Sequence, residues 1–239
     1  MVTLDIISDP ICPWCYIGKT RLDRALGEAG HNPFSPRWRM FRLNPDMPAE
    51  GMDRRAYLEA KFGGPEGADR VYGAIQQAAE GDGLDVNLSS IQRTPQTLDA
   101  HRVIRWASEA GVAEDVTNIL FDRYFRLGED ISDRDLLLEV AGAVGMDRDV
   151  VARLLQGDAD REALIEEEQA AREMGVTGVP CFIIQGRYVV QGAQDSPTWL
   201  RVIDEISTAA SEQNSAAGPE REPEAADGAA PRNGNGGMP

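Results

Sequence analysis

Residues 3–15 read TLDIISDPICPWC, and this stretch decides how the chain begins to fold. Its first half, Thr3–Ser8, is short, apolar and β-branched and stops at Asp9-Pro10, which is typical of a buried strand. A helical pattern begins directly afterwards at Cys12-Pro13, and proline suits the first helical position because its missing N–H would have no partner there. The pattern continues to Gly30, where we expect the helix to end.

The rest of the chain divides into a helical middle and a second group of strands. Arg37–Leu43 alternates polar and apolar residues and predicts a strand, so the N-terminal region is a βαβ unit with parallel strands and a right-handed crossover. From Met52 to Gly175 the apolar residues recur at helical spacing, and we find no convincing strand. Pro180–Ile184 and Tyr188–Gln191 predict a hairpin, and Pro197–Ile206 predicts a closing amphipathic helix.

This order of elements predicts an α/β fold in which an all-helical insertion interrupts a mixed sheet. The sheet half has the elements of a thioredoxin core, and we assign residues 1–45 and 170–207 to this discontinuous thioredoxin-like domain. Residues 46–169 form the predicted helical insertion domain. Residues 208–239 are acidic, rich in Ala, Gly and Pro, and lack Val, Leu, Ile and aromatic residues, so we predict a disordered tail.

Composition narrows the classes of function and the expected location. The formal net charge is −16, so a polyanion would be repelled and nucleic acid is an improbable partner. No stretch approaches the ~20 continuous apolar residues that cross a bilayer, and no membrane partner is expected. The N-terminus has no basic leader or apolar signal core, and the three cysteines are too few for a secreted disulfide framework. We therefore expect a cytoplasmic protein, in which a CxxC pair is catalytic or metal-binding rather than structural.

The Cys12-Pro13-Trp14-Cys15 tetrapeptide has the pattern of a redox-active dithiol. Thiol–disulfide exchange needs a thiolate that attacks and a second thiol close enough to release the mixed disulfide. At a helix start, unpaired N–H groups and the positive end of the helix dipole favour an anion on Cys12. Cys15 lies one turn further, near enough to close a bond but shielded by the helix. We therefore predict that Cys12 attacks and Cys15 resolves.

Zinc is the main rival for the two cysteines, since CxxC is half of many zinc sites. The remaining soft ligands are Cys181, His31 and His101, and none has the spacing of a second ligand pair, so we predict no metal. Pro13 and Trp14 tune the dithiol; Trp14 adds no positive charge, and it either sets a moderate reduction potential or grips substrate as an apolar rim. A chaperone that binds unfolded chains without redox chemistry would keep the fold but would not need both cysteines.

Pro180, in Gly178-Val179-Pro180-Cys181, is the second feature of the sequence that points to function, after the CxxC pair. A proline that opens a strand is permitted because it need not donate to the ladder. Base rates favour a trans bond, because only ~5–6% of X–Pro bonds are cis. The residues alone do not establish the isomer.

Three separated motifs resemble the FrnE-like branch of the DsbA/thioredoxin superfamily, and the resemblance extends from Val2 to about Ile206. The motifs are SDPICPWCYIGK at 8–19, TPQTLDAHR at 94–102 and GVTGVP at 175–180. The resemblance implies a thioredoxin domain with a helical insertion, in which a cis Pro180 faces the dithiol and Val179 binds substrate through its backbone. The buried acid that thioredoxin carries six residues before its first cysteine is replaced by Ile6, so proton transfer must use another group, and Asp9 is a weak candidate.

The same superfamily supplies the alternative function, a glutathione-dependent transferase or isomerase of the kappa or hydroxychromene-carboxylate type. Cys12 aligns with the serine that binds the glutathione thiol in those enzymes, and Asp195 loosely resembles the acid that binds the glutathione amine. Cysteines at both serine positions favour thiol–disulfide exchange over a glutathione-dependent transferase or isomerase. We predict no bound cofactor, with glutathione as an optional co-substrate, and partners that are disulfide-containing proteins or small thiols.

Two further residues have more than one interpretation. Cys181 is interpreted as a buried, inert strand thiol, with a third redox thiol as the alternative. His101 is interpreted as a structural histidine within the insertion, with a general base as the alternative, because no nucleophile lies near it in the sequence.

Overall fold

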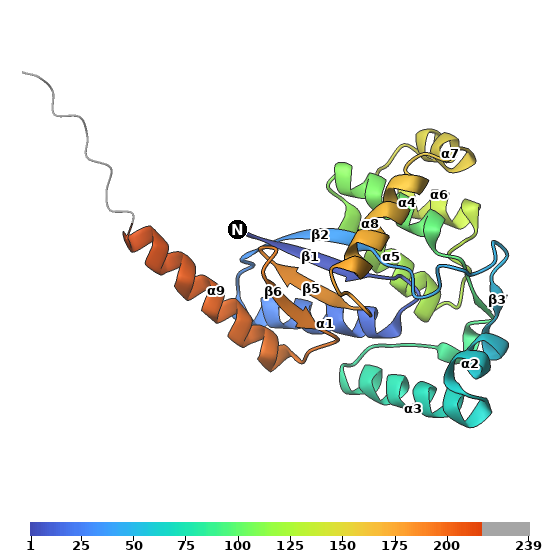
Figure 1. Cartoon of the computed structure of the whole chain (residues 1–239), viewed down its shortest axis with the longest axis horizontal. Coiled ribbons are helices and arrows are strands. Elements are labelled where there is room, and N and C mark those ends of the chain that lie inside the picture. The colour runs from blue at the N-terminus through green and yellow to red at the C-terminus, as the bar shows by residue number, and fades with distance from the viewer. Residues whose placement is uncertain (217–239) are drawn as a thin grey trace, which may run out of the picture.

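The computed structural model describes residues 1–216 and has a four-stranded mixed sheet with the strand order β2-β1-β5-β6 (Figure 1). Strand β1 (Val2–Ser8) pairs in parallel with β2 (Phe34–Met40) and antiparallel with β5 (Cys181–Ile184). Strand β6 (Tyr188–Gln191) completes the hairpin with β5. Helix α1 (Pro13–Ala29) makes the predicted parallel crossover from β1 to β2. The α/β class with a mixed sheet is therefore confirmed.

Each face of the sheet has its own apolar core, because successive side chains of a strand point to opposite faces. One core joins the sheet to α1 and to α9 (Ser196–Ala216). Its buried members are Leu4, Ile6, Leu22, Ala25, Phe34, Phe182, Ile184, Trp199 and Ile203. On the other face, Ile7 and Cys181 pack with Ala171 of α8 (Arg161–Glu173). Burial on both faces explains why β1 has an almost continuous apolar sequence.

Helix α1 begins and ends where the sequence predicts. Pro13 is at the first helical position, and Gly30 ends the helix with a left-handed φ of 71°. Its N–H bonds the carbonyls of Leu26 and Gly27, which closes the last turn.

Strand β2 begins three residues earlier than predicted, at Phe34 instead of Arg37, and ends at Met40. Pro36 lies inside it, opposite Leu4 of β1. Because β2 is an edge strand, a residue without an N–H is tolerated there. The alternation from Arg37 onward therefore identified the strand but not its start.

The chain between β2 and β5 is almost entirely helical. In chain order its helices are α2 (Arg54–Phe62), α3 (Pro65–Gly81), a 3₁₀ turn (Leu88–Ser90), α4 (Leu98–Glu109), α5 (Ala113–Phe125), α6 (Arg134–Ala143), α7 (Arg148–Gln156) and α8. The prediction that this region has no strand is wrong in one place, since β3 (Met52–Asp53) and β4 (Arg93–Thr94) form a small antiparallel ladder. Two-residue strands are too short to leave an alternating pattern. The predicted domain boundaries at residues 45–46 and 169–170 stay predictions.

The largest apolar cluster joins α1 to this helical region. Cys12, Cys15 and Ile17 share it with buried residues of α3, α4, α5 and α6. Tyr16 extends the contact, because its ring stacks 5.2 Å from Phe121 and its hydroxyl donates to Asp122 at 2.6 Å. The dithiol thus lies where the helical region meets the end of the sheet.

The closing helix is longer than predicted. Helix α9 runs to Ala216, so residues 208–216 are helical and the prediction of disorder is wrong for them. An alanine-rich sequence has high helix propensity even without apolar anchors. The remainder of the predicted tail, 217–239, lies outside the described residues. Among residues 1–216, no helix is long and apolar enough to cross a membrane.

We expect Phe182→Ala to lower the free energy of unfolding by about 3–5 kcal/mol, because a fully buried ring would leave a cavity. The Phe182 ring packs edge-on against Trp199 with centroids 4.8 Å apart. The control is Tyr188→Ala on the paired strand, where the side chain is 59% exposed and the loss should stay within about 0.5 kcal/mol. Urea unfolding measures both. Equal losses would contradict the assignment of Phe182 to the core.

Candidate active site

Cys12 occupies the N-cap position of α1, with extended backbone angles of φ −89° and ψ 112°. Its N–H bonds the Asp9 carbonyl at 2.9 Å, and its own carbonyl accepts the N–H of Cys15 at 3.0 Å. No side-chain hydrogen bond caps the helix, and a helix N-terminus favours negative charge on a group placed there. Although a helix start could leave an attacking thiol open to solvent, Cys12 is only 3% exposed, because the helical region and the loop at Val179 cover it.

Cys15 lies 3.5 Å from Cys12 and is completely buried. Burial raises the pKa of the Cys15 thiol well above its usual value, and the neighbouring Cys12 raises it further. The neighbouring Ser8 side chain and Asp9 backbone act in the opposite direction and lower the pKa of Cys15. Cys15 is therefore a protonated thiol at neutral pH, as a resolving residue should be before it attacks.

The loop before β5 lies against the first cysteine. The Cys12 thiol donates to the carbonyl of Val179 with a sulfur–oxygen distance of 3.6 Å, and the Val179–Pro180 peptide bond is cis. Pro180 is buried, whereas Val179 is half-buried. The resemblance placed these two residues beside the dithiol, and the structure has them there.

Gly18, one turn after Cys15, allows this loop to approach α1 closely. A Cβ at Gly18 would lie 3.1 Å from Cγ of Pro180 and 3.2 Å from Cα of Ala193. The N–H of Gly192 also bonds the Pro180 carbonyl at 2.8 Å, which ties the loops on either side of the hairpin together. The loops are therefore joined to each other by a hydrogen bond and held to α1 by packing.

Pro13 and Trp14 are both half-buried, and Trp14 packs against the apolar cluster that contains the cysteines. Trp14 is therefore not a free side chain on the surface. Its indole forms part of the wall beside Cys12.

The Asp195 side chain bonds the start of α9 and not the dithiol. Its carboxylate accepts the N–H of Thr198 at 2.9 Å in the first turn of α9, and the side chain is exposed. This hydrogen bond lowers the pKa of Asp195. The observed role is that of a helix N-cap.

Cys181 packs with Ile7, Phe41 and Val176, in a different cluster from Cys12 and Cys15. Burial raises the pKa of its thiol, which agrees with an inert strand cysteine. Among residues 1–216, no group of three or more His, Cys, Asp or Glu side chains is arranged to hold a metal ion.

Three polar residues behind the dithiol complete the site. The buried Asp9 carboxylate accepts the N–H groups of Leu43 at 2.7 Å and Ile11 at 3.4 Å. His101 of α4 places its Nε2 atom 3.6 Å from Asp9 Oδ1, so the histidine interpreted as structural lies next to the active-site turn. Ser8 was missed in the sequence. Period-two alternation puts it on the same face of β1 as Leu4 and Ile6, which α1 covers.

A family model described as a DSBA-like thioredoxin domain matches residues 3–204. That match covers most of the chain. The chain belongs to this family of DsbA-like thioredoxin-fold proteins.

Three solved structures are similar along nearly their whole length. A probable DsbA oxidoreductase from Streptomyces coelicolor is 26% identical with a TM-score of 0.78, covering 94% of this chain and 93% of its own. A 2-hydroxychromene-2-carboxylate isomerase is 19% identical with a TM-score of 0.65, covering 91% and 100%. The cytosolic disulfide reductase DsbM from Pseudomonas aeruginosa is 17% identical with a TM-score of 0.60, covering 90% and 99%. The last two show the shared fold alone.

We expect the thiol of Cys15 to titrate above the range of an ordinary cysteine. A Cys12→Ser/Cys181→Ala variant leaves Cys15 as the single cysteine, and ultraviolet absorbance follows its thiolate. Desolvation, the largest cause, persists in this variant, so the thiolate should form only in alkaline solution. Adding Ser8→Ala removes a neighbouring polar group that lowers the pKa of Cys15 and should raise that pKa further. An ordinary cysteine titration would show that water reaches Cys15.

Two glycines of α1 provide a matched test of the loop contact. Gly27→Ala adds a methyl group to open space and should stabilise the protein by about 0.5–1 kcal/mol through helix propensity. Gly18→Ala gains the same propensity but must displace Pro180 and Ala193, so we expect a net loss of about 1–3 kcal/mol. Urea unfolding of both variants measures the difference. Equal stabilisation would mean that the loop does not rest on α1.

Proposed function

We propose that this protein is a thiol–disulfide oxidoreductase or isomerase that acts on protein or small-molecule disulfides through Cys12 and Cys15. The observation that carries the proposal is the pair of sulfur side chains 3.5 Å apart at the N-terminus of α1, in a chain of the DsbA-like family. A helix N-terminus stabilises an attacking thiolate, and the one-turn spacing allows a disulfide to close.

The two cysteines have different roles in the proposed reaction. The Cys12 thiolate attacks a substrate disulfide, forms a mixed disulfide and releases one substrate sulfur as a thiol. Cys15 then attacks the Cys12 sulfur, so that the Cys12–Cys15 disulfide forms and the second substrate thiol leaves. The substrate gains two electrons and the dithiol loses them; the same steps in reverse oxidise a substrate. The raised pKa of Cys15 keeps it a neutral thiol until Cys12 is occupied.

The Val179–Pro180 loop is the proposed platform for substrate. The Val179 carbonyl is already a hydrogen-bond partner of Cys12, so a peptide backbone paired with Val179 would bring its sulfur to the same place. Trp14 supplies an apolar wall beside it, and Pro13 fixes the start of α1. These assignments support the FrnE-like subtype, whose partners would be disulfide-containing proteins or low-molecular-weight thiols. A cytoplasmic location stays a prediction from the sequence.

The alternative, a glutathione-dependent transferase or isomerase, needs Cys12 but not Cys15. It also needs an acid at Asp195 for the glutathione amine, and that carboxylate binds the N-terminus of α9. The dithiol is therefore the better basis for function, with glutathione retained as an optional small-thiol co-substrate rather than a bound cofactor.

The cysteine variants separate the two functions. Cys12→Ser should abolish the reduction of insulin disulfides, because the attacking sulfur is lost, whereas Cys15→Ala should accumulate mixed disulfides with substrate. Cys181→Ala is the control and should retain full activity, because that thiol packs in another cluster. Mass spectrometry identifies the trapped adducts. Glutathione conjugation that survives in Cys15→Ala, with no disulfide exchange by the wild type, would establish the alternative instead.

A further inference from the structure

The loop that contains Val179 lies just beyond the end of the β5–β6 ladder. Cys181 and Gln191 form the last pair of that ladder, and Gly192 then takes a left-handed φ of 78°, which glycine adopts at little cost. Regular pairing between the two strands stops at this point, so the carbonyls of residues 178–180 need other hydrogen-bond partners. The partner of the middle carbonyl differs from those of the two beside it.

The side chain of Gln191 bridges the residues on either side of Val179. Its Nε2 atom donates to the Gly178 carbonyl at 3.0 Å and to the Pro180 carbonyl at 3.5 Å. The backbone N–H of Gly192 donates to the same Pro180 carbonyl at 2.8 Å. Both partners of the amide are carbonyl oxygens, so its NH₂ group and not its oxygen must face them. One side chain thus continues the ladder where the backbone of β6 leaves it.

The carbonyl of Val179 instead meets the first cysteine. It accepts a hydrogen bond from the Cys12 thiol, with the sulfur and oxygen 3.6 Å apart. A thiol is a weak donor, and this donor disappears when Cys12 becomes a thiolate or forms a bond to another sulfur. The proposed reaction therefore frees this carbonyl, while Gln191 keeps the carbonyls of Gly178 and Pro180 occupied.

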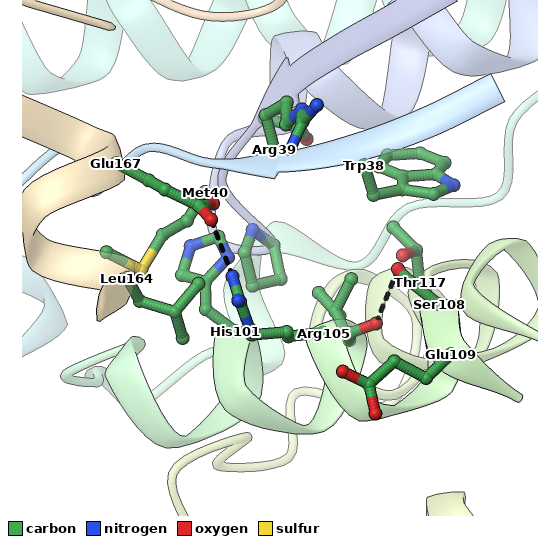
Figure 2. A pocket seen from close by; sticks show the side chains of 13 residues that line it. Trp38, Arg39, Met40, His101, Arg105, Ser108, Glu109, Thr117, Leu164 and Glu167 are labelled. Atoms are coloured by element: carbon green, nitrogen blue, oxygen red, sulfur yellow. Dashed lines mark hydrogen bonds and ion pairs between the residues drawn. The ribbon is translucent and has the colours of Figure 1, made fainter. Parts of the chain in front are cut away.

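A cavity of about 220 Å³ between the end of β2 and helices α4 and α8 is the other recess near the active-site turn (Figure 2). Figure 2 shows Trp38 and Met40 from β2, His101 from α4 and Leu164 from α8 around it. Neither Cys12 nor Cys15 lines this cavity. A disulfide bound there would not touch the attacking sulfur, so the loop at Val179 remains the place where a substrate meets Cys12.

We propose that Gln191 is a positioning residue, which holds the loop so that Val179 offers the one open carbonyl to the backbone of a polypeptide substrate. This inference rests on the proposed function. Gln191 acts through the loop and not on the sulfur atoms, because its amide bonds the carbonyls of Gly178 and Pro180. With those two acceptors occupied, a substrate N–H has one place to bind, next to Cys12. The substrate class that gains from this arrangement is a polypeptide disulfide rather than a small disulfide without a peptide backbone.

The test compares two disulfides in single-turnover reactions of the reduced protein. One is a peptide dimer joined by a single cysteine disulfide, and the other is dithiobis(nitrobenzoate), which has no peptide backbone. Gln191→Met keeps the length of the side chain and removes both N–H donors. We expect the half-saturating peptide concentration to rise about two- to tenfold, the range that a neutral hydrogen bond contributes. The limiting rate with the peptide and the rate with dithiobis(nitrobenzoate) should not change.

Two further variants separate hydrogen bonding from surface polarity. Gln191→Glu has the same length, but its carboxylate accepts and does not donate, so it repels the two loop carbonyls. We expect it to raise the half-saturating peptide concentration at least as much as Gln191→Met. Gln169→Met is the matched control, because that exposed glutamine bonds Glu173 on its own helix at 3.1 Å and should change neither reaction.

A second peptide, methylated on the backbone nitrogens around its cysteine, tests whether Gln191 acts through Val179. This peptide has no N–H to donate there, so the wild type and Gln191→Met should have the same half-saturating concentration for it. No change with the unmethylated peptide, or an equal loss with peptide and dithiobis(nitrobenzoate), would overturn the role of Gln191 and leave the dithiol function intact. A wild type that forms no Cys12–Cys15 disulfide with either reagent would instead refute the proposed function, and this role with it.

Discussion

The carboxylate of Asp9 is buried at the point where β1 turns into α1, and it holds the ends of two parallel strands together. One oxygen accepts the N–H of Leu43, just beyond β2, and the other accepts the N–H of Ile11 within the turn. The turn is also closed by its own backbone, from the N–H of Cys12 to the Asp9 carbonyl. Loss of the carboxylate would leave the buried N–H of Ile11 and the partly buried N–H of Leu43 without this partner, at a cost of about 1–3 kcal/mol for a fully buried group. The position of Cys12 relative to the sheet follows from this side chain.

The second support of the site is the helical region that packs over the start of α1. The ring of Tyr16 stacks with Phe121 and Phe125 of α5, and its hydroxyl bonds Asp122 on the same helix. Both cysteines are members of the same apolar cluster as these helices. As a result both cysteines are buried at the start of α1.

Much of the fold could be predicted because its signals are local. A β-branched run that stops at Asp9-Pro10, a proline at the first helical position and a glycine at the helix end each act within a few residues, and the structure has all three. The start of β2 and the β3–β4 ladder could not be predicted, because an edge-strand proline and two-residue strands leave no periodic pattern. The extent of α9 depends on helix propensity, which a search for apolar anchors overlooks.

Contacts of the site between residues close together in the sequence could be predicted, whereas contacts between residues far apart in the sequence could not. Cys12 and Cys15 are one turn apart, so a helix start alone brings them together. The burial of Cys12 and the meeting of Asp9 with His101 depend on how the helical region packs against the sheet, and 92 positions separate those two side chains along the chain (101 − 9). The spacing of residues in the sequence therefore does not predict that contact. Ser8 is the exception, since alternation along β1 already directs it toward α1.

The cavity between the end of β2 and helices α4 and α8 is not lined by Val179 or Pro180. A large folded substrate docked on the loop would therefore leave the cavity open to bulk water.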